Sequence, residues 1–241
     1  MFRLMIPLIA VLFPVLDCEP VSAGRHLFIL SGQSNMAGLD PQVSFLPAVQ
    51  KEFGRENVVV VKSAVGGQPI RRWYKGWKPA VGDSPKADGQ LYDRMIQSVR
   101  SVLQGARPDT VTFVWMQGER DAKEQHGAVY ADSLRGLVRQ LCTDLEREDV
   151  NCVIGRLSDF DPEGAKYPDW AMIRKVQVEV AESMPRWTWV DTDDLNDGLN
   201  KRGVRIMNDL HYSEAGYRTL GSRFAEQAIR LIHESAAKTG S

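Results

Sequence analysis

The chain has 241 residues, of which 43% are hydrophobic and 25% are charged, the composition of an ordinary globular protein. This length allows one sizeable α/β domain or two small ones. A formal net charge of −1 gives no electrostatic basis for binding nucleic acid or an anionic membrane surface.

The N-terminal segment has the pattern of a secretory signal peptide. Arg3 precedes an apolar run from Leu4 to Leu16, and the small residues Val21-Ser22-Ala23 follow as a cleavage site. The apolar run is short for a membrane span, and an uncleaved N-terminal anchor is the alternative interpretation. We expect residues 1–23 to be removed, which leaves a single domain over residues 24–241 in a secreted or periplasmic protein without membrane attachment.

Strand-like and helical segments alternate along this expected domain. Strands are expected at 26–30, 58–62, 110–116, 151–156 and 187–190, and helices at 91–103, 129–146, 170–184 and 214–232. Ser213 is expected to be the N-cap of the last helix. Such alternation is typical of a parallel sheet covered on both faces, so the sequence predicts a doubly wound α/β fold with five strands.

The first strand ends in a turn that carries a serine. The apolar residues Phe28-Ile29-Leu30 lead into Ser31-Gly32-Gln33-Ser34-Asn35, where Gly32 permits a tight turn. Open α/β folds bind their ligands at the carboxyl ends of the strands. The Ser34 hydroxyl is therefore expected at that edge, where it becomes a nucleophile only if a base accepts its proton.

A long loop, Gly66–Gly89, follows the second strand. It contains several Gly and Pro residues together with Arg71-Arg72-Trp73-Tyr74 and Trp77. Long loops in compact domains are usually functional or disordered, and the aromatic content argues against disorder. Trp and Tyr can stack on sugars and Arg can bind hydroxyls or a carboxylate, whereas the alternative is that the aromatic residues anchor the loop. We expect a mixture, with Arg71 or Trp73 nearest the site.

Three other loops carry residues suited to acyl transfer: Ala64–Gln68, Met116–Asp121 and Asn208–Tyr212. His211 is the expected base, because it alone among the four histidines has a close acidic neighbour and precedes a helix. Backbone N–H groups of Ser34 and of Gly66 or Gly67, with the side-chain amide of Gln117, could stabilise the oxyanion. For Glu119, bracing of the loops is favoured over a direct acid/base role.

Four short motifs occur in a fixed order along the chain: Gly-Gln-Ser-Asn-Met at 32–36, Gly-Gly-Gln at 66–68, Gln-Gly-Glu at 117–119 and Asp-Leu-His at 209–211. With these motifs the chain resembles the SGNH hydrolase superfamily, in the branch of sialate O-acetylesterases and acetylxylan esterases (carbohydrate esterase family six). The resemblance covers nearly all of the expected mature chain. It implies a flavodoxin-like three-layer α/β/α fold, no metal or other cofactor, and deacetylation of a carbohydrate through an acyl-serine.

The resemblance also implies roles for individual residues. It maps the catalytic serine to Ser34, the histidine to His211, the oxyanion glycine to the Gly66-Gly67 pair and the amide donor to Gln117. Many members have an aspartate three residues before the histidine, where this chain has Asn208. We expect Asp209 to orient His211, with a Ser–His dyad helped by a backbone carbonyl as the alternative. Substrate contacts are expected from Gln33, Arg71 and Trp73.

Other possibilities remain open at this point. A catalytically silent carbohydrate-binding protein and a lipase-like esterase are the alternative functions. Cys142 and Cys152, which remain after removal of the leader, could form a disulfide or be two separate buried thiols. They make no metal site, because no histidine accompanies them.

Overall fold

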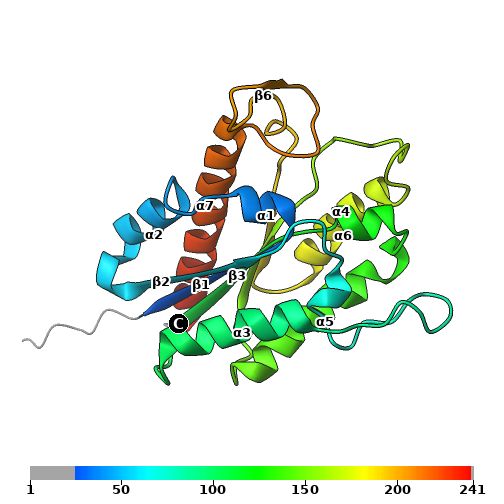
Figure 1. Cartoon of the computed structure of the whole chain (residues 1–241). Coiled ribbons are helices and arrows are strands. Elements are labelled where there is room, and N and C mark those ends of the chain that lie inside the picture. Colours follow the sequence, from blue (N-terminus) through cyan, green and yellow to red (C-terminus); the bar gives the residue numbers. More distant parts are fainter. Residues whose placement is uncertain (1–24, 240–241) are drawn as a thin grey trace, which may run out of the picture.

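The computed structural model describes residues 25–239, so the expected leader at 1–23 lies outside the described part. The main sheet has the strand order β2-β1-β3-β4-β5, with all neighbours parallel (Figure 1). The strands are β1 (His26–Gly32), β2 (Val58–Ala64), β3 (Thr110–Met116), β4 (Asn151–Gly155) and β5 (Trp187–Val190). This is the flavodoxin-like order, which confirms the predicted fold.

Helices cover both faces of the sheet. On one face lie α2 (Phe45–Phe53) and α7 (Glu214–Thr239), which pack against each other, and on the other lie α3 (Gln90–Leu103), α5 (Gly127–Asp144) and α6 (Trp170–Ser183). The last helix packs on β3, β4 and β5, as expected. Ser213 Oγ accepts the backbone N–H of Gly216 at 3.0 Å, which confirms Ser213 as the N-cap of α7.

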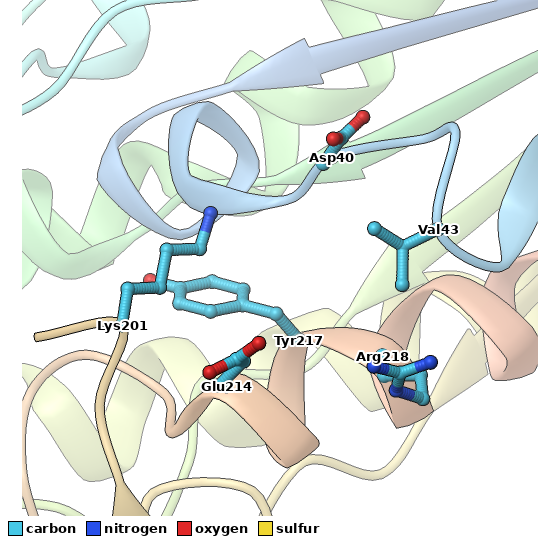
Figure 2. A pocket seen from close by; sticks show the side chains of 6 residues that line it. All are labelled: Asp40, Val43, Lys201, Glu214, Tyr217 and Arg218. Carbon is cyan, nitrogen blue, oxygen red and sulfur yellow. The ribbon is translucent and has the colours of Figure 1, made fainter. Parts of the chain in front are cut away.

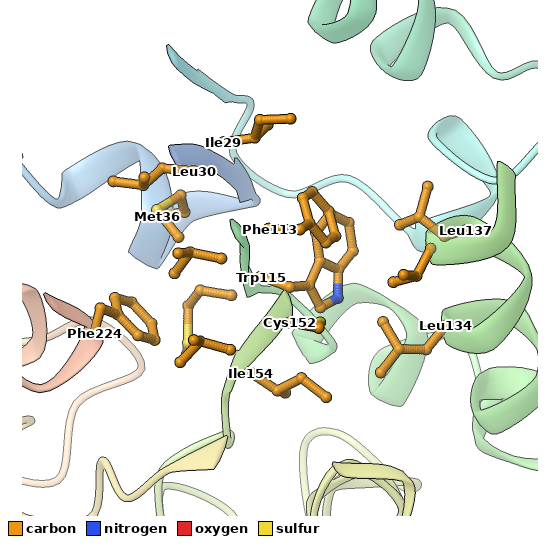
Figure 3. Packing of buried hydrophobic residues seen from close by; sticks show 14 of the residues in the cluster. Ile29, Leu30, Met36, Phe113, Trp115, Leu134, Leu137, Cys152, Ile154 and Phe224 are labelled. Atoms are coloured by element: carbon orange, nitrogen blue, oxygen red, sulfur yellow. The ribbon is translucent and has the colours of Figure 1, made fainter. Parts of the chain in front are cut away.

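The core lies on both sides of the strands because both faces are covered. Residues 27–30 of β1 are fully buried, and Phe28 meets Phe45 of α2 edge-on with ring centroids 5.5 Å apart. Figure 3 shows Leu30 and Phe224 on one side of the strands, with Trp115 among the α5 leucines on the other. A continuous apolar run is what a strand buried on both faces requires.

Shorter elements surround the carboxyl edge of the sheet. Two five-residue helices, α1 (Ser34–Gly38) and α4 (Glu119–Lys123), follow β1 and β3. A small antiparallel hairpin, β6 (Gly198–Leu199) and β7 (Arg205–Ile206), precedes α7, and single 3-10 turns lie at 55–57 and 70–72. In Figure 1 the hairpin stands above the N-terminal end of α7.

Gly32 brings the ends of β1 and β3 into direct contact. Its φ is +143°, and a Cβ at this position would lie 1.9 Å from the carbonyl oxygen of Met116. The next residue, Gln33, donates its backbone N–H to that same oxygen at 2.9 Å. Only glycine fits such an approach, so the predicted tight turn is confirmed and the loops after β1 and β3 begin side by side.

The two cysteines of the described chain are free thiols, Cys152 fully buried and Cys142 partly buried. The structure therefore agrees with separate thiols rather than with a disulfide. No helix within residues 25–239 has the length and apolar character needed to cross a bilayer.

Candidate active site

Ser34 is the first residue of α1 and is partly exposed at the carboxyl edge of β1. Gly66 faces it from the loop after β2, since a Cβ built on Gly66 would lie 3.6 Å from the Ser34 Cβ. Val65 fixes this approach by donating its backbone N–H to the Gly32 carbonyl at 3.1 Å. Gly67 is exposed and has a φ of +67°. The expected oxyanion glycines are thus beside the serine or one residue from it.

The short helix α1 is held at its C-terminal end by two lysines. Lys62 of β2 donates from Nζ to the carbonyls of Ala37, at 2.9 Å, and Leu39. Lys201, in the turn of the hairpin, donates from Nζ to the Gly38 carbonyl at 2.6 Å. Carbonyls at the end of a helix lack intrahelical partners, and cations are favourable there. The two lysines therefore stabilise the helix that carries Ser34.

Asn35 joins the serine loop to two other loops and to α7. Its Nδ2 donates to Glu119 Oε1 at 3.0 Å and to the Leu210 carbonyl at 3.1 Å. Its Oδ1 accepts the Tyr217 hydroxyl at 3.0 Å. With only 2% of its surface exposed, this side chain has all its hydrogen bonds inside the protein. This bracing role of Asn35 was not predicted, and the signals for it in the sequence were its position next to Ser34 and its place in the Gly-Gln-Ser-Asn-Met motif.

Two buried carboxyl groups lie on α4. Glu119 is bound by Asn35, and burial raises its pKa to about 7. Asp121 Oδ2 accepts the backbone N–H of Ile70 at 2.8 Å and the Gln117 amide at 2.5 Å, and burial raises its pKa to about 7 as well. Desolvation penalises the charged form of both groups. Each acid connects α4 to another loop, the arrangement expected of groups that brace the site.

The side chain of Gln117 is fully buried among internal partners. Its Nε2 donates to Asp121 Oδ2, to the Gln68 carbonyl at 3.1 Å and to Gln33 Oε1 at 3.3 Å. Its Oε1 accepts the Tyr130 hydroxyl at 3.0 Å. These contacts join the loops after β1, β2 and β3. The expected role of the Gln117 amide as an oxyanion donor stays a prediction.

Gln33 also has internal contacts. Its Oε1 accepts the backbone N–H of Arg120 at 3.1 Å in addition to the Gln117 amide, and its residue surface is 3% exposed. The oxygen therefore connects the loops after β1 and β3. A substrate contact of Gln33 stays a prediction.

His211 is half exposed in the loop before α7, next to Asp209. Its backbone N–H donates to Asp209 Oδ1 at 2.8 Å, and its Nδ1 lies 3.9 Å from the same oxygen, beyond hydrogen-bond distance. The Asn208 side chain instead bonds to Asn196 and to the Phe160 carbonyl. Asp209 is thus the carboxylate beside the imidazole.

Ser34 and His211 are brought together indirectly. Among the described residues no direct hydrogen bond joins the two side chains, and the link runs from Asn35 to the Leu210 carbonyl. A hollow of about 330 Å³ lies beside His211 and Asp209, bounded on its other side by the hairpin turn at 200–202.

Trp73 and Trp77 of the long loop serve as anchors. Trp73 is fully buried, donates Nε1–H to Ser31 Oγ at 3.1 Å and meets Trp115 edge-on. A ring with no exposed surface cannot stack on a sugar, so the structure places Trp73 in the core and not in the substrate site. Arg71 is bound to Glu124 and lies over the Trp77 ring. The anchoring interpretation accounts for these contacts.

No set of three or more His, Cys, Asp or Glu side chains within residues 25–239 is arranged to hold a metal ion.

The profile of the family described as carbohydrate esterase, sialic acid-specific acetylesterase, matches residues 37–230. The chain belongs to this carbohydrate esterase family. The match begins three residues after Ser34. A comparison with curated protein sequences finds no match.

Several solved structures have a similar fold. A protein from Arabidopsis thaliana has a TM-score of 0.65 at 18% identity, over 86% of this chain and 98% of that one. A carbohydrate acetylesterase from Xanthomonas citri has a TM-score of 0.64 at 18% identity, over 86% of this chain and 56% of that one. NanS has a TM-score of 0.61 at 14% identity, over 89% of this chain and 100% of that one. At these identities the similarity establishes the fold, and the family membership supports esterase activity.

Proposed function

We propose that this carbohydrate esterase removes O-acetyl groups from an acetylated glycan, of xylan or sialic-acid type, through an acetyl-Ser34 intermediate. The observation that carries the proposal is the position of Ser34. It begins a helix at the carboxyl edge of the sheet, with Gly66 beside it and the His211 loop attached to the next residue through Asn35. A nucleophile, a backbone oxyanion site and a base are thereby drawn from three loops.

The reaction follows the chemistry of serine esterases. Ser34 Oγ attacks the acetyl carbonyl while His211 takes its proton, and the tetrahedral oxyanion is stabilised by backbone N–H groups of Ser34 and Gly66 or Gly67. Collapse breaks the ester bond, and His211 returns the proton to the departing sugar hydroxyl. Water, deprotonated by His211, then attacks acetyl-Ser34 and releases acetate. Asp209 orients the imidazole once the 3.9 Å distance between its Oδ1 and His211 Nδ1 shortens to a hydrogen bond.

We assign Gln117 a positioning role in this scheme. Its Nε2 has three internal acceptors for its two N–H groups, and they include Gln33 Oε1 and the Gln68 carbonyl. An amide held in this way fixes the positions of the loops after β1, β2 and β3 relative to one another. Glu119 and Asp121 act as braces in the same network.

The N-terminal pattern supports a further part of the proposal, that the mature enzyme acts outside the cytoplasm. Residues 1–23 carry the leader pattern. N-terminal sequencing of the protein from the periplasm and the medium tests this. A mature N-terminus near Gly24 is expected, and an intact Met1 in a cytoplasmic product would contradict it.

The esterase proposal is tested with Ser34→Ala. We expect hydrolysis of p-nitrophenyl acetate and acetate release from acetylated xylan and O-acetylated sialic acid to fall at least ~10³-fold. Ser101→Ala, an exposed serine of α3, is the matched control and should keep full activity. Undiminished turnover by the Ser34 variant would refute the mechanism. Glycan binding by the wild type without acetate release would indicate a binding protein, and a preference for long acyl chains a lipase-like enzyme.

A further inference from the structure

We propose that a second hollow beside the site binds the neighbouring sugar of the glycan, so that the preferred substrate is an oligosaccharide rather than a free acetylated sugar. This inference rests on the proposed esterase function. The hollow measures about 290 Å³ and is lined by Asp40, Val43, Lys201, Glu214, Tyr217 and Arg218 (Figure 2). Its volume is at the lower end of small-molecule pockets, which suits one sugar unit.

The second hollow adjoins the hollow beside His211. Lys201 and Tyr217 line both of them. Lys201 binds the carbonyl of Gly38, the last residue of α1, and Tyr217 binds the side chain of Asn35. Four helical steps from Ser34 to Gly38 span about 6 Å. In this proposal a sugar whose acetyl group reaches Ser34 lies beside His211, and the next sugar unit extends past the end of α1 into the second hollow.

The lining of the second hollow suits an uncharged, hydroxyl-bearing ligand. Asp40 and Glu214 supply two carboxylates, and Lys201 and Arg218 supply two cations, so the formal charges balance. Carboxylates accept and cations donate hydrogen bonds, whereas sugar hydroxyls do both. An anionic or cationic ligand would meet an equal number of like charges.

Two of these charged groups are free to bind. The carboxylate of Glu214 and the guanidinium of Arg218 have no hydrogen-bond or ion-pair partner within the described chain, and both residues are exposed on the first turns of α7. Figure 2 shows them across the hollow from Asp40 and Val43, which follow α1. Val43, 45% exposed, adds an apolar patch on that side.

The test compares each acetylated sugar with and without its neighbours. The pairs are O-acetylated sialic acid against O-acetylated sialyllactose, and acetylated methyl xyloside against acetylated xylotriose. We expect kcat/KM to be about tenfold higher for the longer member of the pair that the enzyme accepts, from hydrogen bonds to charged groups. The double variant Glu214→Gln, Arg218→Ala should lose this preference and keep p-nitrophenyl acetate turnover within about twofold.

A matched control lies on the same helix. Glu226→Gln with Arg230→Ala changes the same residue types 12 positions further along α7, about 18 Å away, and should keep the preference. The proposal fails if both members of each pair react equally, if the double variant keeps the preference, or if the longer glycans are not hydrolysed while Ser34-dependent aryl acetate hydrolysis persists. Aryl acetate hydrolysis that survives Ser34→Ala would instead refute the esterase mechanism.

Discussion

The side-chain amide of Asn35 donates a 3.1 Å hydrogen bond to the carbonyl of Leu210, so the residue after the proposed nucleophile is joined to the residue before the proposed base. Asn35→Ala removes this bond and leaves buried Glu119 without its amide donor. Leaving a buried acceptor without its donor costs roughly 1–3 kcal/mol, and a loss of that size in the transition state lowers kcat roughly 5- to 150-fold.

The control for Asn35→Ala is Asn57→Ala. Asn57 is also buried and donates to a backbone carbonyl, that of Phe53, far from the site. Both variants should lose stability in thermal melts, but only Asn35→Ala should lower kcat at unchanged KM. Equal kcat in the two folded variants would show that the Asn35–Leu210 bond does not position His211.

A second prediction concerns the pH dependence of stability through Glu119. Its pKa is raised from 4.5 to about 7 by burial, so between these values the folded state keeps a proton that the unfolded state has lost. Its contribution to the free energy of unfolding should therefore decrease as the pH rises from about 4.5 through 7, by an amount on the order of 3 kcal/mol. Above about pH 7 the contribution levels off.

Glu119→Gln isolates this contribution. Asp121, whose pKa is also raised, and His126, whose pKa is lowered, titrate in both proteins. Urea unfolding of the two proteins from pH 4.5 to 8 gives the difference between their free energies of unfolding. The free energy of unfolding of the wild type should decrease relative to that of Glu119→Gln as the pH rises. A difference that does not change with pH would contradict a protonated Glu119 in the folded state.

A third prediction compares two adjacent glycines. Gly66→Ala places a methyl group 3.6 Å from the Ser34 Cβ, at ordinary contact distance and without a positive φ, so folding should be unaffected. The methyl intrudes on the space of the reacting ester, and kcat/KM should fall roughly 10-fold. Gly67→Ala enters open space at φ +67°, so it should cost roughly 1 kcal/mol of stability and leave kcat/KM higher than in the Gly66 variant. The reverse order would remove Gly66 from the oxyanion site.

The fourth prediction separates Asp209 from Asn208. Asp209→Ala removes the carboxylate beside His211, and kcat for p-nitrophenyl acetate should fall at least ~10-fold, since an unoriented imidazole is a poor base. Asn208→Ala should leave kcat near the wild-type value, because that side chain bonds to Asn196 and Phe160. Its φ of +42° predicts a loss of stability instead. A larger kcat loss for Asn208→Ala would reverse the assignment.

The sequence predicted the regular part of the fold well. All five strands begin at the expected residues, and α3, α5 and α6 lie within two residues of their expected limits. The last helix begins as expected at Glu214 but continues to Thr239, seven residues beyond its expected end. The elements it did not predict are short. A five-residue helix such as α1 or α4 has too few residues for helical periodicity, α2 contains Pro47, and the hairpin strands have two residues each.

The site was predicted only in part, for a physical reason. The parallel sheet required the loops of Ser34 and Gln117 to emerge together, so their proximity followed from strand order. The hydrogen bond from Asn35 to Leu210 joins residues 175 positions apart, and no local sequence pattern predicts it. The aromatic loop was ambiguous because a tryptophan that anchors a loop and one that stacks on a sugar have the same sequence, and only the burial of Trp73 decides between them.

The position of Lys201 has a consequence for how such an enzyme can change. Its ammonium group binds the carbonyl of the last residue of the serine helix, and the residue lines both hollows. A five-residue helix has little stability of its own, so its geometry depends on such outside contacts. Mutations in the hairpin that adapt the enzyme to another glycan would therefore also disturb the nucleophile, and glycan preference and turnover number would evolve together rather than independently.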